Sequence, residues 1–378
     1  MKLFHISDLH LGKRLCEHSL LDDQRFILSQ ITAAIDAEKP DALLIAGDIY
    51  DKAIPPVEAV TLFDDFLYGL TQRGLPVLLI SGNHDSAERV TFGFRLFTRS
   101  GLFFAPVYQG TVEPITIEDA YGPVDFYLLP FVKPSHVRRY HPQEDPVSYT
   151  DAMACAIRHM PLDPDRRNVL VTHQFVTGAA LSNSEEISVG GSENVDAAVF
   201  APFDYVALGH IHGPQNIHEQ HIRYCGSPLK YSFSEASHQK SITVVQLDQK
   251  GCVAVKTLPL TPKRELLKLK GSFELLTSPD FYRQQNREAY LQITLTNEEL
   301  IPNAMQTLQL IYPNLLNLLF DNCRTAANQT VAAIGNPEIR RPEEHFAELY
   351  QLQNNQPMTE EQYQYIRQLV EQIREEKA

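Results

Sequence analysis

Several residues that commonly bind metal ions follow directly after apolar, strand-like runs of this chain. The runs cover residues 2–7, 42–46, 77–81, 169–172 and 205–208. The candidate ligands at their ends are Asp8, His10, Asp48, Asn83, His173, His210 and His212. In open α/β sheets, binding sites form in the crevice beyond the carboxyl ends of the strands. The pattern therefore predicts that these side chains meet at one edge and hold two metal ions.

The types of these side chains suit a particular kind of centre. One residue separates Asp8 from His10, and because strand side chains alternate between faces, we expect both to point to the same side. The Asp48 carboxylate can bridge two cations, which lie roughly 3.5–4 Å apart in two-metal sites. A mixture of carboxylate, amide and imidazole ligands without a thiolate suits two Mn²⁺ ions, with Fe²⁺ or Zn²⁺ as alternatives.

Each motif also has an ordinary structural interpretation. An Asp-x-His pair occurs by chance, and Gly-Asp or Gly-Asn-His-Asp can be a simple turn. The metal hypothesis depends on their joint occurrence, in this order and at strand ends. The other histidines lack such a setting, and we expect them to be surface or structural residues: His5, His18, His136, His141, His159, His218, His221, His238 and His345.

Composition and charge narrow the classes of protein. The 378 residues are 43% hydrophobic, with no apolar run long enough to span a bilayer. The first residues lack the pattern of a signal peptide, so we expect a cytoplasmic protein without a membrane segment. Five cysteines without CxxC spacing indicate reduced thiols and no zinc ribbon: Cys16, Cys155, Cys225, Cys252 and Cys323.

The formal net charge of −14 is unusual for a protein that grips DNA alone, because neutralisation of phosphates drives such binding. Either the substrate is not nucleic acid, or metals, local basic patches and a partner supply the attraction.

Strand-like and helix-like patterns alternate up to about residue 260, which predicts an α/β domain of two sheets with helices outside. The expected helices cover residues 19–38, 56–70, 88–98 and 149–160, and further strands cover 126–131, 222–225, 241–247 and 252–258.

The amino-acid composition changes after about residue 260, and we expect domains at 1–260, 261–341 and 342–378. The second is a small α+β unit, with strands at 265–269, 289–294 and 314–319 and a helix at 298–311, that ends in a linker. The third is a helical tail.

The strand-end motifs resemble the five signatures of calcineurin-like metallophosphoesterases. The segments HISDLHLGK, GDIYDKAIPP, SGNHDSAERV, THQFVTGAALSNSE and LGHIHGPQ resemble the SbcD family of bacterial nucleases more closely, over the first 260 residues. That resemblance implies a two-sheet sandwich flanked by helices, a small α+β capping domain that recognises DNA, and a C-terminal helix-loop-helix.

The resemblance also implies roles for individual residues. One metal would be held by Asp8, His10, Asp48 and His212, and the other by Asp48, Asn83, His173 and His210. His84 would protonate the leaving oxygen or stabilise charge on the phosphoryl group. The alternative is that His84 has only a structural role, as a hydrogen-bond partner of Asp48 or of the backbone. Archaeal and eukaryotic relatives carry a histidine where this chain has Asp51, so any role of a second histidine is in doubt.

The implied activity is that of a Mn²⁺-dependent DNA phosphodiesterase, a 3′–5′ exonuclease on duplex ends and an endonuclease on single strands and hairpins. The resemblance also implies a nucleoid-associated protein that works with an SbcC-type, SMC-like ATPase in DNA repair and recombination. Lys13 and Arg14, beside the expected site, are weak candidates for DNA contacts. A small-molecule phosphodiesterase or protein phosphatase with the same centre, and a metal-binding scaffold without catalysis, are the alternatives.

Two further elements point to assembly. The helix at 56–70 and the one at 88–98 carry more apolar residues than one buried face needs, and in the family they form a dimer interface, which implies a homodimer within a heterotetramer. The final helix begins with Thr359-x-x-Gln362, which matches a capping box. Its apolar stripe predicts a docking surface for the ATPase: Tyr363, Ile366, Leu369, Val370 and Ile373.

Overall fold

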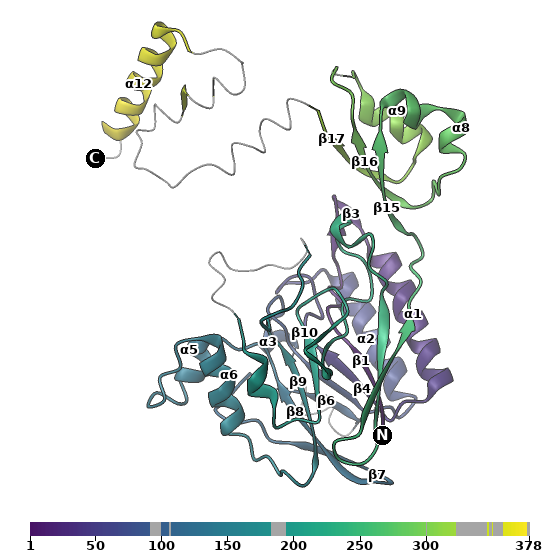
Figure 1. The fold of residues 1–378 in the computed structure, drawn as a ribbon, viewed down its shortest axis with the longest axis vertical. Coiled ribbons are helices and arrows are strands. Elements are labelled where there is room, and N and C mark those ends of the chain that lie inside the picture. Colours follow the sequence, from purple (N-terminus) through teal and green to yellow (C-terminus); the bar gives the residue numbers. More distant parts are fainter. Residues whose placement is uncertain are drawn as a thin grey trace. The chain divides into compact units, whose positions relative to one another are not determined.

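The structure is a computed structural model that describes residues 1–90, 100–105, 107–182, 194–299, 301–322, 346–347, 350 and 358–375. The chain divides into two compact units (Figure 1). The first comprises Met1–Lys268, Asn286–Gln292 and Tyr312–Asn317, and the second comprises Leu269–Gln285, Ile293–Ile311 and Leu318–Ala378.

The first unit contains two sheets, each of six strands within the described residues. The first has the order β14 (Val253–Pro259), β13 (Ser241–Leu247), β1 (Lys2–Ile6), β4 (Ala42–Ala46), β5 (Val77–Ile80) and β6 (Leu102–Phe104). The second has the order β11 (Gln215–Ile217), β12 (Glu219–Tyr224), β10 (Tyr205–Gly209), β9 (Arg167–His173), β8 (Gly122–Leu129) and β7 (Ile115–Asp119). The strands that precede the predicted ligands are parallel within each sheet, so their carboxyl ends share an edge.

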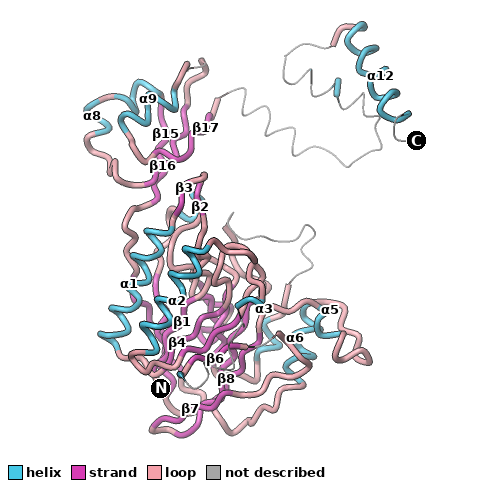
Figure 2. The backbone as a smooth tube through the Cα atoms, turned by 180° about the vertical axis from the view of Figure 1, so that it is seen from behind, coloured by secondary structure: helices cyan, strands magenta, loops and turns pink. Residues whose placement is uncertain are grey.

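The two sheets pack face to face, with helices outside (Figures 1 and 2). Alternate residues of β4 serve different cores: Leu44 packs between the sheets with Val169, whereas Leu43 faces the outer core with Ile31. Because both faces of β4 and β5 are covered, these two strands are apolar throughout. The outer layers are α1 (Leu21–Glu38) and α2 (Val57–Thr71) on one side and α6 (Tyr149–Arg158) on the other. The predicted two-sheet α/β fold is confirmed.

Short elements complete the first unit: β2 (Arg14–Leu15), β3 (His18–Ser19), α3 (Ala87–Val90), α5 (Pro134–Arg138), and the 3-10 turns η2 (Ala197–Phe200) and η3 (Phe233–Glu235). The helix expected at 88–98 matches α3 at its start, and residues 91–99 lie outside the described part of the chain. Among the described residues, no helix is long and apolar enough to cross a bilayer.

A third sheet comprises β15 (Leu266–Gly271), β16 (Tyr290–Leu295) and β17 (Leu315–Phe320), and the C-terminal half of each strand belongs to the second unit. Helices α7 (Phe273–Thr277) and α8 (Pro279–Tyr282) were not expected. The helix α9 (Ala304–Ile311) begins later than the predicted residue 298, because Asn303 has φ 54° and cannot continue a right-handed helix upstream. Most of the expected linker at 321–341 lies outside the described residues.

The last described helix is α12 (Glu360–Glu375). Its predicted capping box is confirmed: the Thr359 amide donates to Gln362 Oε1 at 2.9 Å, and the Gln362 amide donates to Thr359 Oγ1 at 3.3 Å. Two donors at the helix start are thereby satisfied.

Candidate metal centre

The predicted ligands lie in loops that follow β1, β4, β5, β9 and β10. The loop after β1 is bound to the loop after β4, because the Asp8 amide donates to Gly47 O and the His10 amide donates to Asp48 O, both at 3.0 Å. The alternation argument for Asp8 and His10 was wrong: β1 ends at Ile6, and both residues are in a loop with positive φ, 53° and 40°.

Left-handed backbone recurs at the site. Asp48 has φ 49° and His210 has φ 104°. Such conformations cost about 1–3 kcal/mol each in residues other than glycine and persist where the surroundings hold them. Hydrogen bonds hold both residues: the Asp48 carbonyl oxygen accepts from the His10 amide at 3.0 Å, and the His210 amide donates to both Asp8 carboxylate oxygens, at 3.1 and 3.2 Å.

Two glycines allow the loops to approach closely. A Cβ at Gly82 would meet the Asp48 carboxylate and, at 2.5 Å, its backbone nitrogen. A Cβ at Gly209 would collide with the carbonyl oxygen of Ala46. The Gly-Asn-His-Asp and Gly-His motifs are therefore more than turns, since no larger residue fits between the neighbouring loops at Gly82 or between the two sheets at Gly209.

One group of donor atoms comprises Asp8, His10 and His212, whose ligand atoms all lie within 4.8 Å of one another. The Nε2 atoms of His10 and His212 face each other at 3.1 Å. His10 Nε2 also lies 3.6 Å from Asp48 Oδ2. Ring nitrogens this close, with a carboxylate beside them, are the arrangement that a shared cation requires.

A second group is centred on Asn83. Its Oδ1 lies 3.0 Å from His173 Nε2 and 3.0 Å from His210 Nδ1. Asp48 Oδ2 lies 3.3 Å from the same His173 nitrogen. The carboxylate of Asp48 thus belongs to both groups.

The electrostatics of the two groups fit divalent cations. Burial, followed by the charge of His173, lowers the pKa of His210 to about 3, and burial lowers that of His10 well below its usual range. Burial opposes the charge of His173, but the Asp48 carboxylate, the Asp8 carboxylate and the Ala46 carbonyl oxygen raise its pKa to about 9. The ionised carboxylate and the uncharged rings of His10 and His210 are the forms that bind metal ions, whereas His173 must release its proton to bind one.

A buried pair behind His212 escaped the sequence analysis. Glu235 Oε1 lies 3.3 Å from His212 Nδ1, and Glu235 Oε2 lies 2.5 Å from Lys240 Nζ. Lys240 also donates to the carbonyl oxygen of His212 at 2.8 Å. Carboxylates in this position orient a ligating histidine and increase its basicity. No spacing announces Glu235, which comes from η3, 23 residues after His212.

His84 lies beside the two groups, with its side chain 14% exposed. Its Nδ1 is 3.1 Å from the carbonyl oxygen of Asp51, and its Nε2 is 4.0 Å from Asp48 Oδ2. A ring nitrogen at that distance from a carbonyl oxygen is a donor, so Nε2 is the nitrogen directed toward the centre.

The two candidates for DNA contacts differ in their surroundings. Lys13 Nζ is 2.7 Å from Asp51 Oδ1 and its side chain is 22% exposed. Arg14 has a side chain that is 57% exposed and contacts Glu17.

A cleft of about 860 Å³ opens beside Asn83 and His210. Its wall carries Lys133 and Arg139, which were not among the residues singled out from the sequence. Both are exposed, and cationic side chains in such a cleft can contact phosphates.

Fold and site together define a class of protein, and comparison with known families agrees. The profile of the calcineurin-like phosphoesterase family matches residues 1–214, so the chain belongs to that class of metal-dependent phosphodiester hydrolases. A second profile, described as the type 5 capsule protein repressor C-terminal domain, matches residues 262–354.

Within that class, the chain belongs to the SbcD family, the D subunits of SbcCD nucleases. The SbcD subunit of the SbcCD nuclease from Staphylococcus epidermidis is 35% identical over 329 residues, which cover 85% of this chain and 87% of the relative. The protein of the same name from Staphylococcus saprophyticus is 34% identical over 322 residues, which cover 84% of each. A solved structure, TT1561 of Thermus thermophilus, aligns with 68% of this chain and 98% of its own at 11% identity and a TM-score of 0.34.

Proposed function

We propose that this chain is the nuclease subunit of a complex with an SbcC-type, SMC-like ATPase and that it acts in DNA repair and recombination. It is a Mn²⁺-dependent 3′–5′ exonuclease on duplex ends and an endonuclease on single strands and hairpins. The observation that carries the proposal is the pair of donor groups that share Asp48, with His84 beside them. The names of the relatives support a nuclease that works in such a complex.

The proposed metal ligands are those of the sequence analysis. Asp8, His10 and His212 hold one cation with Asp48, and Asn83, His173 and His210 hold the other with Asp48. The cations supply neutralisation of the phosphodiester and an activated water molecule. The ligand set favours Mn²⁺ over Mg²⁺, because four imidazoles disfavour a hard cation that prefers oxygen and keeps its waters.

The chain's own residues complete the reaction. As the bond from phosphorus to the 3′ oxygen breaks, the leaving oxygen takes a proton from His84 Nε2. The Asp51 carbonyl, 3.1 Å from His84 Nδ1, accepts a hydrogen bond that holds the ring in position. Lys133 and Arg139, along the cleft, bind neighbouring phosphates, and Lys13 and Arg14 are additional candidates.

The proposed domains are a nuclease domain at 1–260, a capping domain for DNA with its linker at 261–341, and a partner-binding tail at 342–378. The proposed assembly is a homodimer within a heterotetramer with the ATPase.

The test is a turnover comparison on the full chain, with and without the ATPase and ATP. Duplex DNA, a hairpin, a cyclic nucleotide and a phosphopeptide are each supplied with Mn²⁺ or Mg²⁺. We expect DNA cleavage with Mn²⁺, much less with Mg²⁺, and none by Asp48→Asn, which controls for contaminating nucleases. Equal rates with both metals at saturation contradict the metal assignment. Turnover of the cyclic nucleotide or phosphopeptide in preference to DNA contradicts the substrate.

A further inference from the structure

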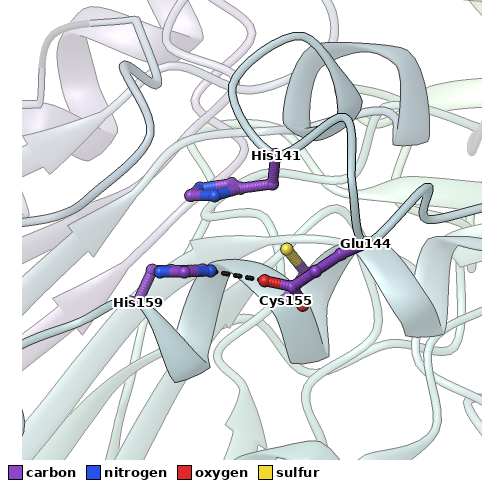
Figure 3. Close-up of side chains that lie close together, drawn as sticks. All are labelled: His141, Glu144, Cys155 and His159. Carbon is purple, nitrogen blue, oxygen red and sulfur yellow. Dashed lines mark hydrogen bonds and ion pairs between the residues drawn. The ribbon is translucent and has the colours of Figure 1, made fainter.

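A separate cluster of side chains that can bind a metal ion lies in the first unit, apart from the candidate metal centre. It comprises His141, Glu144, Cys155 and His159 (Figure 3). One donor atom from each residue lies within 4.8 Å of the donor atoms of the other three. His141 and His159 were expected to be surface or structural residues, and their place in a group of possible metal ligands was not anticipated.

Local structure brings the four residues together. Cys155 is in the last turn of α6, and His159 is the residue that ends this helix, so the two are four positions apart on one helical face. His141 and Glu144 belong to the turn after α5, which is closed by a 3.2 Å hydrogen bond from the Glu144 amide to the His141 carbonyl oxygen. Figure 3 shows this turn directly above the helix.

The surroundings of His141 select one of its ring nitrogens as a ligand. Its Nε2 lies 2.7 Å from the carbonyl oxygen of Gly110 and 3.1 Å from the Tyr108 hydroxyl. The nitrogen nearest a carbonyl carries the proton, which leaves the lone pair on Nδ1. Histidines that bind metals almost always donate their other N–H to a carbonyl or carboxylate in this way.

Glu144 is held ionised next to the remaining donors. Arg158, followed by His159, lowers the pKa of Glu144 to about 2, and Glu144 Oε1 lies 2.5 Å from His159 Nε2. Cys155 is fully buried, and burial and then the Glu144 carboxylate raise the pKa of its thiol to about 11. An anionic oxygen is thus placed beside a buried sulfur, an arrangement that a cation stabilises.

We propose that His141, Glu144, Cys155 and His159 form a structural zinc site. Two imidazoles, one thiolate and one carboxylate are a ligand set that Zn²⁺ binds tetrahedrally, and four protein ligands leave no open position for catalysis. Bond lengths of about 2.0–2.3 Å place such ligands about 3.3–3.8 Å apart, so the group must contract slightly. The two imidazole rings are stacked, with centroids 3.8 Å apart and planes 12° from parallel, and His141 must rotate to direct Nδ1 at the ion.

The bound ion would fasten the turn after α5 to the end of α6. Arg139 and Tyr140, just before His141, line the cleft beside the candidate centre, so the zinc site braces one wall of that cleft. As zinc binds, the Cys155 thiol gives its proton to solvent and its sulfur takes the metal, which is the ordinary proton balance of a thiolate site.

Cobalt substitution tests the proposal without relying on activity. The full chain is stripped of metal and titrated with Co²⁺, and the near-ultraviolet charge-transfer band from thiolate to Co²⁺ is recorded together with the visible bands of tetrahedral Co²⁺. The ligands of the candidate nuclease centre include no thiolate, so the charge-transfer band reports only on a cysteine site. We expect the band in the unaltered chain, and its displacement by Zn²⁺ but not by Mg²⁺.

Variants assign the band to the four residues. Cys155→Ser should abolish it, whereas Cys252→Ser, at an exposed cysteine, should leave it unchanged. Because serine at a buried position can impair folding, His159→Gln and Glu144→Gln provide a second test at side chains that are 41% and 33% exposed. Loss of a residue that only hydrogen-bonds to a metal ligand weakens metal binding roughly 10–100-fold. Each of these variants loses a ligand and should weaken Co²⁺ binding by more than that. Absence of the band in the unaltered chain, its survival in Cys155→Ser, or unchanged Co²⁺ affinity in both other variants overturns the proposal.

Discussion

The geometry around His84 bears on whether this residue donates a proton or binds a metal ion. Its Nδ1 is held by the Asp51 carbonyl, and its Nε2 lies 4.0 Å from Asp48 Oδ2, farther than the corresponding nitrogens of His10 and His173. We propose that His84 is a proton donor at this position and not a ligand, although one of its ring nitrogens lies within 4.8 Å of donor atoms of His10 and Asp48.

We expect His84→Ala to keep two metal ions per chain while DNA cleavage falls about 10²–10⁴-fold, the usual contribution of general acid catalysis. Metal content and turnover are measured on the same sample. His221→Ala, at a histidine paired with Glu219, serves as the control and should retain both. Loss of metal in His84→Ala would make His84 a ligand, and retained turnover would make it structural.

Glu235 and Lys240 provide a second test at this scale. In Glu235→Gln, the buried Lys240 loses its charge partner and His212 loses the carboxylate that orients it. We expect metal affinity to fall roughly 10–100-fold and unfolding free energy to fall by about 3–5 kcal/mol, measured by chelator competition and denaturant unfolding. Glu219→Gln is the matched control, since that side chain is 72% exposed. Equal metal affinity in the two variants would show that Glu235 does not support the centre.

Residue types at strand ends were enough to predict which side chains meet, because parallel strands bring their carboxyl ends to one edge. Glu235 could not be predicted in this way. It comes from a short 3-10 turn, and its relation to His212 arises only when the loop after β12 folds back on the site. The group around Cys155 and His141 could not be predicted either, because only the fold brings the turn after α5 to the end of α6.

At the scale of elements, the loops that carry the ligands depend on close approach of the loops after β4 and β5, two neighbouring strands of the first sheet. Gly82 lies against Asp48, where any side chain would displace the carboxylate shared by both groups of donors.

We therefore expect Gly82→Ala to lose metal binding and cleavage together, as measured by metal analysis and DNA turnover. Gly69→Ala is the control, because a Cβ at that position in α2 would meet only Arg73, at 3.6 Å. Replacing a glycine within a helix by alanine should raise stability by up to about 1 kcal/mol. Full metal content in Gly82→Ala would show that the loop can move aside.

The start of α2 supports the proposed dimer. Ile54, Val57 and Val60 are 69%, 76% and 43% exposed, a group of apolar side chains beyond what packing on the sheet uses. We expect Val57→Asp combined with Val60→Asp to convert the dimer to monomers in sedimentation velocity. Val147→Asp changes a residue of equal type and 73% exposure elsewhere and should leave the dimer intact. A chain that is monomeric before mutation would contradict the proposed assembly.

Apolar periodicity predicted α1, α2, α6 and the strands that precede the site, since these patterns are regular, whereas the edge strands β6, β7 and β11 were not expected. It failed for α7 and α8, which span five and four residues, because a single turn of helix gives too few positions for a period to show.

For the whole molecule, the net charge of −14 leaves DNA affinity to be explained. Exposed Lys133 and Arg139 on the cleft supply a local attraction. An ATPase partner would supply more, and the tail is the candidate for binding it. In α12, Tyr363 and Ile366 are half-buried and Leu369 is 40% exposed, so the described part of the apolar stripe retains surface that a partner can cover.

Removal of residues 342–378 should abolish co-purification with the ATPase and ATP-stimulated cleavage of duplex ends. It should spare Mn²⁺-dependent hydrolysis of a small phosphodiester, because the predicted ligands all precede residue 213. Ile366→Asp in the full chain tests the stripe itself, and Gln368→Asp, at an exposed position of the same helix, is its control. Two short helices bury too little apolar surface to be stable alone, which is why we expect the stripe to bind a partner. Unchanged affinity of the truncated chain for the ATPase would place the docking site elsewhere, and loss of small-substrate hydrolysis would show that the tail folds back on the catalytic domain.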